Sequence, residues 1–250
     1  MKLRGLLLSA AVALTMAPPA MAERASDGNV SIIYWQAPSI LNPYLSSGTK
    51  DIESSSLVIE PLGRYTETGA MVPYLAKEIP TVANGGVSAD LKSITWQLKD
   101  GLKWSDGSAV TSADVKFTAD YCMNPDGGCS QLAKFDHVTS VETPDASTVV
   151  VSFAQPMPNP YGPFMGGQSP IIQKAQFENC VGAQAQSCTE QNFGPIGTGP
   201  FVVTEFRPND VIQMKANDNY RDPSKPAFAT LTFKGGGDAM GAGRSVLETG

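Results

Sequence analysis

Histidine is almost absent from this 250-residue sequence, which contains only His137. Neither a Gly-x-Ser-x-Gly nor a His-Glu-x-x-His motif occurs, so the sequence offers no nucleophile elbow and no helical zinc site. His137 has no obvious carboxylate partner, and lone histidines are mostly structural or exposed, so we assign it no role. We therefore predict that the protein is not an enzyme and has no catalytic residue, no metal ligand and no cofactor.

Basic residues are also scarce, because 18 Lys and Arg stand against 24 Asp and Glu, for a formal net charge of -6. A nucleic acid or an anionic membrane surface needs a basic face on its protein partner. The charge balance therefore argues against both partners. Solubility alone is enough to account for the acidity.

Long apolar runs are lacking after the first residues of the chain. Lys2 and Arg4 precede an apolar run over 6–17, and small residues up to Ala22 match what a signal peptidase recognises. The run is shorter than the ~20 residues of a membrane-spanning helix, and a proline pair interrupts it. No cysteine lies near the cleavage site. We predict a signal peptide over 1–22, cleaved after Ala22, and an exported protein without a lipid anchor.

The sequence has only four cysteines, and they fall into two close pairs. Cys122 lies near Cys129, and Cys180 lies near Cys188, each pair separated by turn-rich sequence. In an exported chain this pattern predicts two local disulfides. Each would stabilise the fold by roughly 2–3 kcal/mol if its effect is mainly on the entropy of the unfolded chain. A metal site is the alternative, but neither spacing has the Cys-x-x-Cys form.

The stretch 94–107 has the clearest local pattern. Ile94, Trp96 and Leu98 alternate with polar residues, which is the period of a strand with one buried face. Asp100-Gly101 then predicts a two-residue hairpin turn and a short return strand. The segment should therefore form a small antiparallel unit.

A helix should follow this unit. Thr111 stands three residues before Asp114, and this spacing predicts a capping box and a helix that begins near Ser112. Periodicity and turn residues predict further elements along the chain. They are a strand over 30–35 buried on both faces, a helix over 51–62, a hairpin about 68–69, strands over 138–141 and 148–153, a hairpin of 201–206 with 211–215, a strand over 230–233 and a helix running toward Glu248.

The stretch 96–115 resembles the signature of the solute-binding proteins of peptide and nickel ABC importers (family 5 extracellular solute-binding proteins). That signature has the form Trp-x-(Leu/Phe)-(Lys/Arg)-x-Gly-x-(Lys/Arg)-(Trp/Phe)-x-Asp-Gly-x-x-(Val/Leu)-Thr-Ala-x-Asp-Val. The matching residues are Trp96, Leu98, Lys99, Gly101, Lys103, Trp104, Asp106, Gly107, Val110, Thr111, Asp114 and Val115. Ser112 stands where the family usually has Ala.

Four further motifs of the family flank this signature. They are Leu41-Asn42-Pro43, Pro73-Tyr74-Leu75-Ala76, Gly197-Thr198-Gly199-Pro200-Phe201, and Asn217 with Tyr220. Together the matches span nearly all of the chain after the leader. They mark the scaffold of the family and not its ligand chemistry.

The resemblance implies an α/β (mixed α+β) fold, namely lobe one of a periplasmic-binding-protein-like structure with an inserted β-rich subdomain. Residues 23–62 and 191–250 would form the core subdomain of lobe one, and residues 63–190 the inserted subdomain. Whole members of the family are much longer than this chain. The resemblance therefore predicts that the second lobe is missing from this sequence.

The implied function is that of the periplasmic substrate-binding component of an ABC transporter. Such a protein captures short peptides as a monomer and delivers them to a permease in the inner membrane. Nickel, haem, an oligosaccharide or an opine remain alternative ligands within the family. A secreted, disulfide-linked interaction protein with no transport role is the alternative outside it.

The candidate ligand contacts lie near the start of the mature chain. Ser46, Ser47, Gly48 and Thr49 form a small polar loop that offers backbone groups where a ligand can approach closely. The residues alone favour an ordinary surface loop, whereas the resemblance places ligand contacts here. We add Trp35, at the end of the first predicted strand, to the candidate set.

Overall fold

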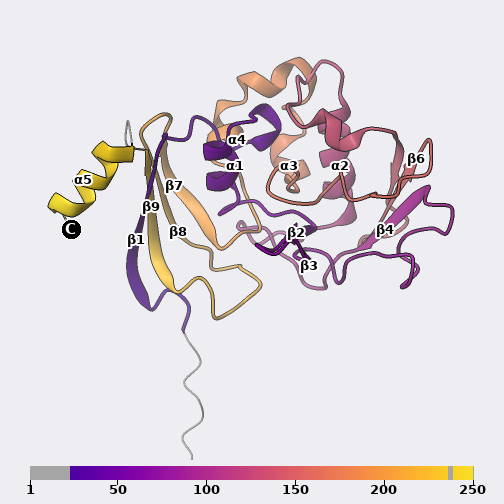
Figure 1. Cartoon of the computed structure of the whole chain (residues 1–250), viewed down its shortest axis with the longest axis horizontal. Helices are drawn as coiled ribbons and strands as arrows, with labels where there is room; N and C mark the ends of the chain where they lie inside the picture. The colour runs from indigo at the N-terminus through magenta and orange to yellow at the C-terminus, as the bar shows by residue number, and fades with distance from the viewer. Residues whose placement is uncertain (1–22, 236–238, 250) are drawn as a thin grey trace, which may run out of the picture.

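The computed structural model describes residues 23–235 and 239–249. The predicted signal peptide over 1–22 lies outside the described residues. Figure 1 shows a narrow sheet at one end of the molecule and a broader region of helices, loops and short strands at the other. Within the described residues, no helix is both long and apolar enough to cross a membrane.

The narrow sheet takes its strands from both ends of the chain. Its order is β1-β9-β8-β7. The first strand, β1 (Asp27–Tyr34), runs parallel to β9 (Phe228–Gly235), whereas β8 (Val211–Ala216) is antiparallel to both β9 and β7 (Phe201–Arg207). The predicted hairpin of 201–215 and the predicted strand at 230–233 are confirmed.

The prediction that the first strand is buried on both faces is wrong. In the described sheet β1 is an edge strand with β9 as its one neighbour, and Ile33 is 40% exposed. Val30, Ile32 and Tyr34 pack against the core, while the alternate positions face outward. The continuous apolar run suggested a central strand, but burial depends on how many layers cover the sheet, which the run does not encode.

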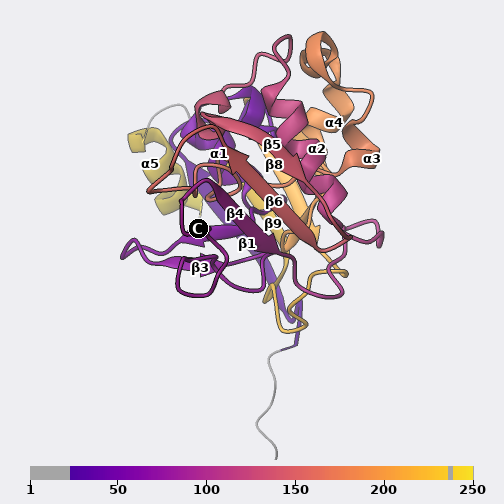
Figure 2. The ribbon, with the colours of Figure 1, turned by 90° about the vertical axis from the view of Figure 1, so that its right-hand side faces the viewer.

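A second, three-stranded antiparallel sheet lies in the broader region. Its order is β4-β6-β5, formed by β4 (Ser93–Gln97), β6 (Thr148–Phe153) and β5 (Val138–Glu142). Figure 2 shows this sheet facing the viewer with α2 (Ser112–Met123) beside it. The predicted strands over 138–141 and 148–153 and the alternating strand at 94–98 are confirmed.

The predicted hairpin at Asp100-Gly101 is only half correct. The turn forms, and Gly101 has a φ of +69°, which glycine adopts without strain. However, the partner of β4 is β6, with Trp96 opposite Val149. The residues after the turn instead form their own small loop, in which the Trp104 amide donates to the Ser108 carbonyl.

The helix after this loop begins where the capping box predicts. The carboxylate of Asp114 accepts a hydrogen bond from the Thr111 amide at 2.9 Å, and α2 starts at Ser112. The other oxygen of Asp114 accepts from the Lys174 amide at 3.0 Å. This helix end is therefore tied to a segment sixty residues further along the chain.

The predicted helix over 51–62 is wrong in length, because α1 spans only Thr49–Ser55. After Ser55 the backbone carbonyls accept hydrogen bonds from residues distant in the chain. The Leu57 carbonyl accepts from the Phe201 amide and the Val58 carbonyl accepts from the Gly199 amide. These long-range bonds replace the helical ones.

Apart from α5, which has 11 residues, the remaining described elements are short. They are β2 (Gly63–Tyr65), β3 (Met71–Pro73), α3 (Lys174–Phe177), α4 (Thr189–Phe193), α5 (Ala239–Thr249) and 3-10 turns at Pro43–Leu45, Leu132–Phe135 and Gly182–Ser187. The β2–β3 pair is the predicted hairpin about 68–69, and α5 is the predicted helix toward Glu248.

Buried apolar side chains form two separate clusters. The sheet cluster lies on the four-stranded sheet, and its buried members are Leu41, Val58, Ile59, Phe201, Ile212, Met214, Leu231 and Phe233. The large cluster fills the broader region around Trp96, Trp104 and Tyr44. The chain first crosses from one cluster to the other between Leu41 and Tyr44, immediately before the predicted ligand loop.

Candidate functional site

Both strands of the parallel pair end at the same edge of the sheet. Trp35 follows β1, and Gly235 is the last residue of β9. An open hollow lies here, and its lining residues are Trp35, Gln36, Ala37, Lys50, Asn209 and Gly235. In open α/β sheets ligands bind in the crevice beyond the carboxyl ends of the strands. The hollow is therefore the candidate site with the best topological position.

Trp35 is the aromatic residue of this hollow. Its indole is 50% exposed, whereas Trp96 and Trp104 are buried. The ring of the preceding Tyr34 lies 5.7 Å from the Trp35 ring and 5.4 Å from the Phe233 ring in the sheet cluster. The residue before Trp35 is thus anchored in the sheet cluster, while Trp35 itself is half exposed.

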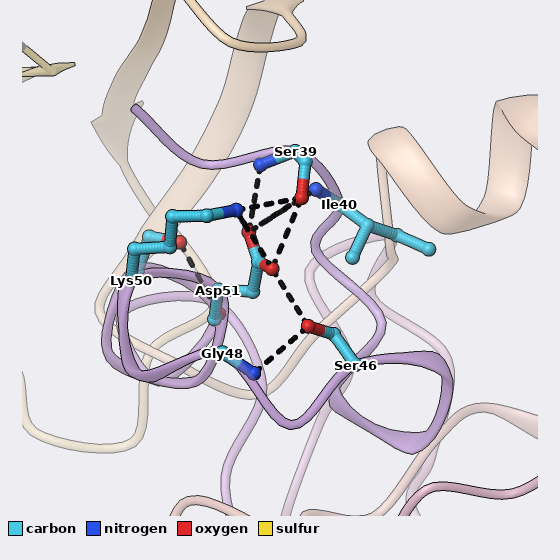
Figure 3. A network of polar contacts seen from close by, with 7 residues as sticks. Ser39, Ile40, Ser46, Gly48, Lys50 and Asp51 are labelled. Atoms are coloured by element: carbon cyan, nitrogen blue, oxygen red, sulfur yellow. Dashed lines mark hydrogen bonds and ion pairs between the residues drawn. The ribbon is translucent and has the colours of Figure 1, made fainter. Parts of the chain in front are cut away.

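Asp51, in the first turn of α1, organises the backbone beside the hollow (Figure 3). Its carboxylate is almost fully buried. It accepts hydrogen bonds from the Ser39 amide at 2.7 Å, the Ile40 amide at 3.3 Å, the Ser46 hydroxyl at 2.7 Å and the Lys50 ammonium at 3.0 Å. One side chain thereby holds together the exit from β1, the predicted loop and the start of the helix.

The charge of Asp51 is fully compensated. Burial by itself raises the pKa of this carboxyl, but the hydrogen bonds from Ser39, Ser46 and Lys50 outweigh burial and hold the pKa below its usual range. The Lys50 side chain is 17% exposed and also donates to Ser39 Oγ at 2.7 Å. Lys50 therefore links the Asp51 network to the hollow, whose wall it forms.

The structure separates the predicted loop residues into two groups. The Ser46 hydroxyl donates to Asp51 and accepts from the Gly48 amide at 3.0 Å, so both groups are engaged within the loop. Ser47 and Thr49 are exposed. Trp35 lines the hollow together with Lys50, whereas the four loop residues are not among the lining residues. No ligand contact of these five residues is tested by this geometry, and their binding role stays a prediction.

Sequence reasoning missed Lys50, Asp51 and Asn209. The adjacent charges of Lys50 and Asp51, directly after a small polar loop, were a usable signal for the first two. Asn209 lies in the turn between β7 and β8, and nothing in its local sequence indicates that this turn reaches the end of β1. Its amide donates to the Pro38 carbonyl at 2.8 Å.

The family motifs further along the chain serve the scaffold. Asn217 donates from its side chain to the Gly199 carbonyl, and Asn219 donates to the Ser105 carbonyl in the signature loop. Arg221 forms an ion pair with Glu60, which is 1% exposed, and Thr198 donates to the same carboxylate. The Asn219–Ser105 bond joins the core segments to the signature loop, whereas the contacts of Glu60 tie residues 23–62 to residues 191–250, and none of these contacts involves a residue that lines the hollow.

Both predicted disulfides are present. The Cα atoms of Cys122 and Cys129 are 5.1 Å apart, and those of Cys180 and Cys188 are 5.8 Å apart. Among the described residues, no group of His, Cys, Asp and Glu side chains is arranged to hold a metal ion.

The mixed α/β architecture and a polar hollow at the carboxyl ends of its parallel strands define the class as one lobe of a periplasmic-binding-protein fold. Residues 70–250 match the family described as bacterial extracellular solute-binding proteins, family 5 Middle. The chain belongs to this family.

Known proteins agree with this assignment. A putative ABC transporter peptide-binding protein of Brucella ovis is 30% identical over 220 residues, which cover 86% of this chain and 40% of that protein. The oligopeptide-binding protein AppA of Bacillus subtilis, solved with a nonapeptide, has a TM-score of 0.77 at 23% identity, covering 90% of this chain and 43% of AppA. The protein AgaA of A. tumefaciens R10, solved with agropinic acid, has a TM-score of 0.75 at 25% identity, covering 88% and 42%. This chain thus spans less than half the length of each.

Proposed function

We propose that the full-length protein containing this chain captures short peptides for import by an ABC transporter. The observation that carries the proposal is the match, over 86% of this chain, to a relative named as a peptide-binding protein of an ABC transporter. The protein acts as a monomeric receptor and not as an enzyme. It delivers its ligand to a permease in the inner membrane and has no nucleic-acid partner.

The place of action follows from the same assignment. The family is one of extracellular solute-binding proteins. We propose that the leader over 1–22 exports the chain to the periplasmic space and is cleaved after Ala22. The mature protein then begins at Glu23, just before Arg24, whose guanidinium donates to the carbonyl oxygens of Asn217 and Tyr220.

The two apolar clusters support a division of the chain into two subdomains. We assign residues 23–62 and 191–250 to a core subdomain built on the sheet cluster, and residues 63–190 to an inserted subdomain built on the large cluster. Tyr44 and Leu62 are exceptions, because they lie in the first segment but are buried in the large cluster, and Leu45 and Ile196 also pack against it. The predicted ligand loop therefore begins at the joint between the two.

The hollow suits a peptide for two reasons. Its charges are balanced, because Lys50 is paired with Asp51, so it neither demands nor rejects a charged side chain. Main-chain hydrogen bonds let one site accept peptides with many side chains, and an exposed indole offers an apolar surface to whichever side chain lies there. We assign ligand contact to Trp35, Ser47 and Thr49, and a shaping role to Ser46 and Gly48.

An opine is the second candidate ligand, because AgaA was solved with agropinic acid and matches this chain with a TM-score of 0.75 at 25% identity. Nickel, haem and oligosaccharides are the remaining alternatives. Because Lys50 and Asp51 are paired, the charge of the hollow favours none of these ligands over the others.

Calorimetry on the full-length gene product tests the proposal, with di- to pentapeptides, an opine, nickel and a glycan as separate ligands. We expect heat with peptides and none with the others. Binding of an opine, nickel or a glycan without any peptide would overturn the choice of ligand.

A pair of exposed aromatic residues supplies a matched test of the site. Trp35→Ala should weaken peptide binding by about tenfold, the effect of truncating a well-placed aromatic anchor. Tyr65→Ala removes an aromatic residue of similar exposure, 49%, outside the lining of the hollow and should leave binding unchanged. Equal effects of the two substitutions would show that the hollow is not the ligand site.

A further inference from the structure

The predicted ligand loop is held from behind by the large cluster. Tyr44, just before the loop, is fully buried, and its hydroxyl donates to the Pro170 carbonyl at 2.5 Å. The Tyr44 carbonyl in turn accepts from the Ser130 amide at 2.7 Å. The loop that follows therefore starts from a residue that is fixed in the large cluster.

Gln131 provides the next support. Its side chain is 6% exposed, and its Nε2 donates to the Pro43 carbonyl at 3.2 Å and to the Ser46 carbonyl at 3.0 Å. Since both partners are carbonyl oxygens, the nitrogen and not the oxygen of the amide must face them. Each amide hydrogen bonds one end of the turn that leads into the loop, at Pro43 and at Ser46.

Ser46 connects Gln131 to the Asp51 network through hydrogen bonds. Its carbonyl is held by Gln131, while its hydroxyl donates to Asp51 and accepts from the Gly48 amide. A displacement of Gln131 would therefore shift Ser46 and with it the backbone of Ser47 and Gly48. No other side chain among the described residues has a hydrogen bond to the Ser46 carbonyl.

The position of Gln131 is itself constrained covalently. Cys129, two residues earlier, is bonded to Cys122 near the end of α2. The start of α2 is fixed by the Asp114 carboxylate, which bonds the amides of Thr111 and Lys174. The disulfide therefore ties the segment of Gln131 to α2, and the Gln131 side chain ties that segment to Ser46.

We propose that Gln131 is a positioning residue for the ligand, and that the Cys122–Cys129 disulfide sets its position. The proposal rests on the proposed function, because it assumes that the loop after Ser46 contacts the ligand. Gln131 touches no ligand itself. It fixes the geometry of the loop before the ligand arrives, so that less ordering is needed on binding.

The test uses the full-length protein with Gln131→Met, which keeps the length of the side chain but removes both donors. Two readouts are needed: the dissociation constant for a bound peptide, and hydrogen exchange at the amides of Leu45, Ser46 and Gly48. We expect both the dissociation constant and the exchange rates to rise by about three- to tenfold, the effect of losing one or two neutral hydrogen bonds. A Cys122→Ser, Cys129→Ser double variant should change both readouts in the same direction.

The matched control is Gln176→Met. Gln176 also bonds backbone groups, the Gly194 carbonyl and the Ile196 amide, but these lie outside the candidate site. It should leave the peptide dissociation constant and the exchange of the Leu45, Ser46 and Gly48 amides unchanged. Amides in β8 and β9 should exchange at the wild-type rate in both variants, which separates a local effect from global destabilisation.

The outcomes separate the two proposals. Unchanged exchange at the loop amides in Gln131→Met would overturn the positioning role, whatever happens to peptide affinity. Faster exchange with unchanged affinity would show that Gln131 holds a loop that the ligand does not need, which also overturns it. Peptide binding by the wild type in either case would leave the proposed function standing.

Discussion

The carbonyl oxygen of Val58 stands 1.8 Å from the point where a Cβ on residue 197 would lie, so only glycine fits at Gly197. The same carbonyl accepts a hydrogen bond from the Gly199 amide at 2.8 Å. The Gly-x-Gly pair therefore lets the segment before β7 contact the segment after α1 directly, backbone against backbone. This contact ends the helix at Ser55 and brings the two ends of the core together.

Gly197→Ala should prevent normal folding or lower the stability by several kcal/mol, because a backbone carbonyl cannot move aside as a flexible side chain can. Gly28→Ala is the control, since a Cβ at Gly28 meets nothing within 4 Å. Thermal unfolding of the two variants beside the wild type decides the matter. Similar melting temperatures for all three would show that the contact between 58 and 197 is not needed.

Arg221→Met should destabilise the protein by about 3 kcal/mol or more, because it leaves the buried Glu60 carboxylate without its cation. The substitution also removes a guanidinium that lies 4.8 Å from the Tyr220 ring and 5.4 Å from the Tyr74 ring. Lys77→Met breaks the exposed pair with Asp100 and should cost at most about 1 kcal/mol. Denaturant unfolding measures both, and equal costs would contradict the importance of the buried pair.

Asp51→Asn should change how stability depends on pH. The folded pKa of Asp51 lies below its usual value, so its contribution is complete above the unfolded pKa of about 4 and is lost as the pH falls through the folded pKa. The variant should therefore be less stable than wild type at pH 7, and the difference should shrink as the pH falls below about 4. Asp136→Asn, at an exposed position, is the control. A difference that stays constant from pH 7 to pH 3 would show that the Asp51 charge is not responsible.

Mass mapping of the exported protein without reduction should find Cys122 linked to Cys129, Cys180 linked to Cys188, and an amino terminus at Glu23. Replacement of both cysteines of one pair by serine should lower the stability by roughly 2–3 kcal/mol, the entropy of closing a short loop. A crossed link such as Cys129 with Cys180 would contradict the observed pairing. An amino terminus at Met1 would contradict the predicted leader.

Local sequence was enough to predict the parts of this protein whose causes are local. Thr111 and Asp114 determine the start of α2, because a capping box needs only residues three apart. The proximity of Cys122 to Cys129 and of Cys180 to Cys188 determined their pairing in the same way. The signature around Trp96 and Trp104 identified the family, and the family implied the fold.

Tertiary structure decided what depends on residues distant in the chain. The end of α1 is set by Gly199 and Phe201, the partner of β4 is β6, and in the described sheet β1 pairs with β9, which comes nearly two hundred residues later. The candidate site also depends on residues that are distant in the chain. Asn209 reaches the end of β1, and Gln131 reaches Ser46 across 85 residues. Short-range patterns specify turns, caps and nearby disulfides, whereas a binding site is made where separate segments meet, and no local pattern records which segments those are.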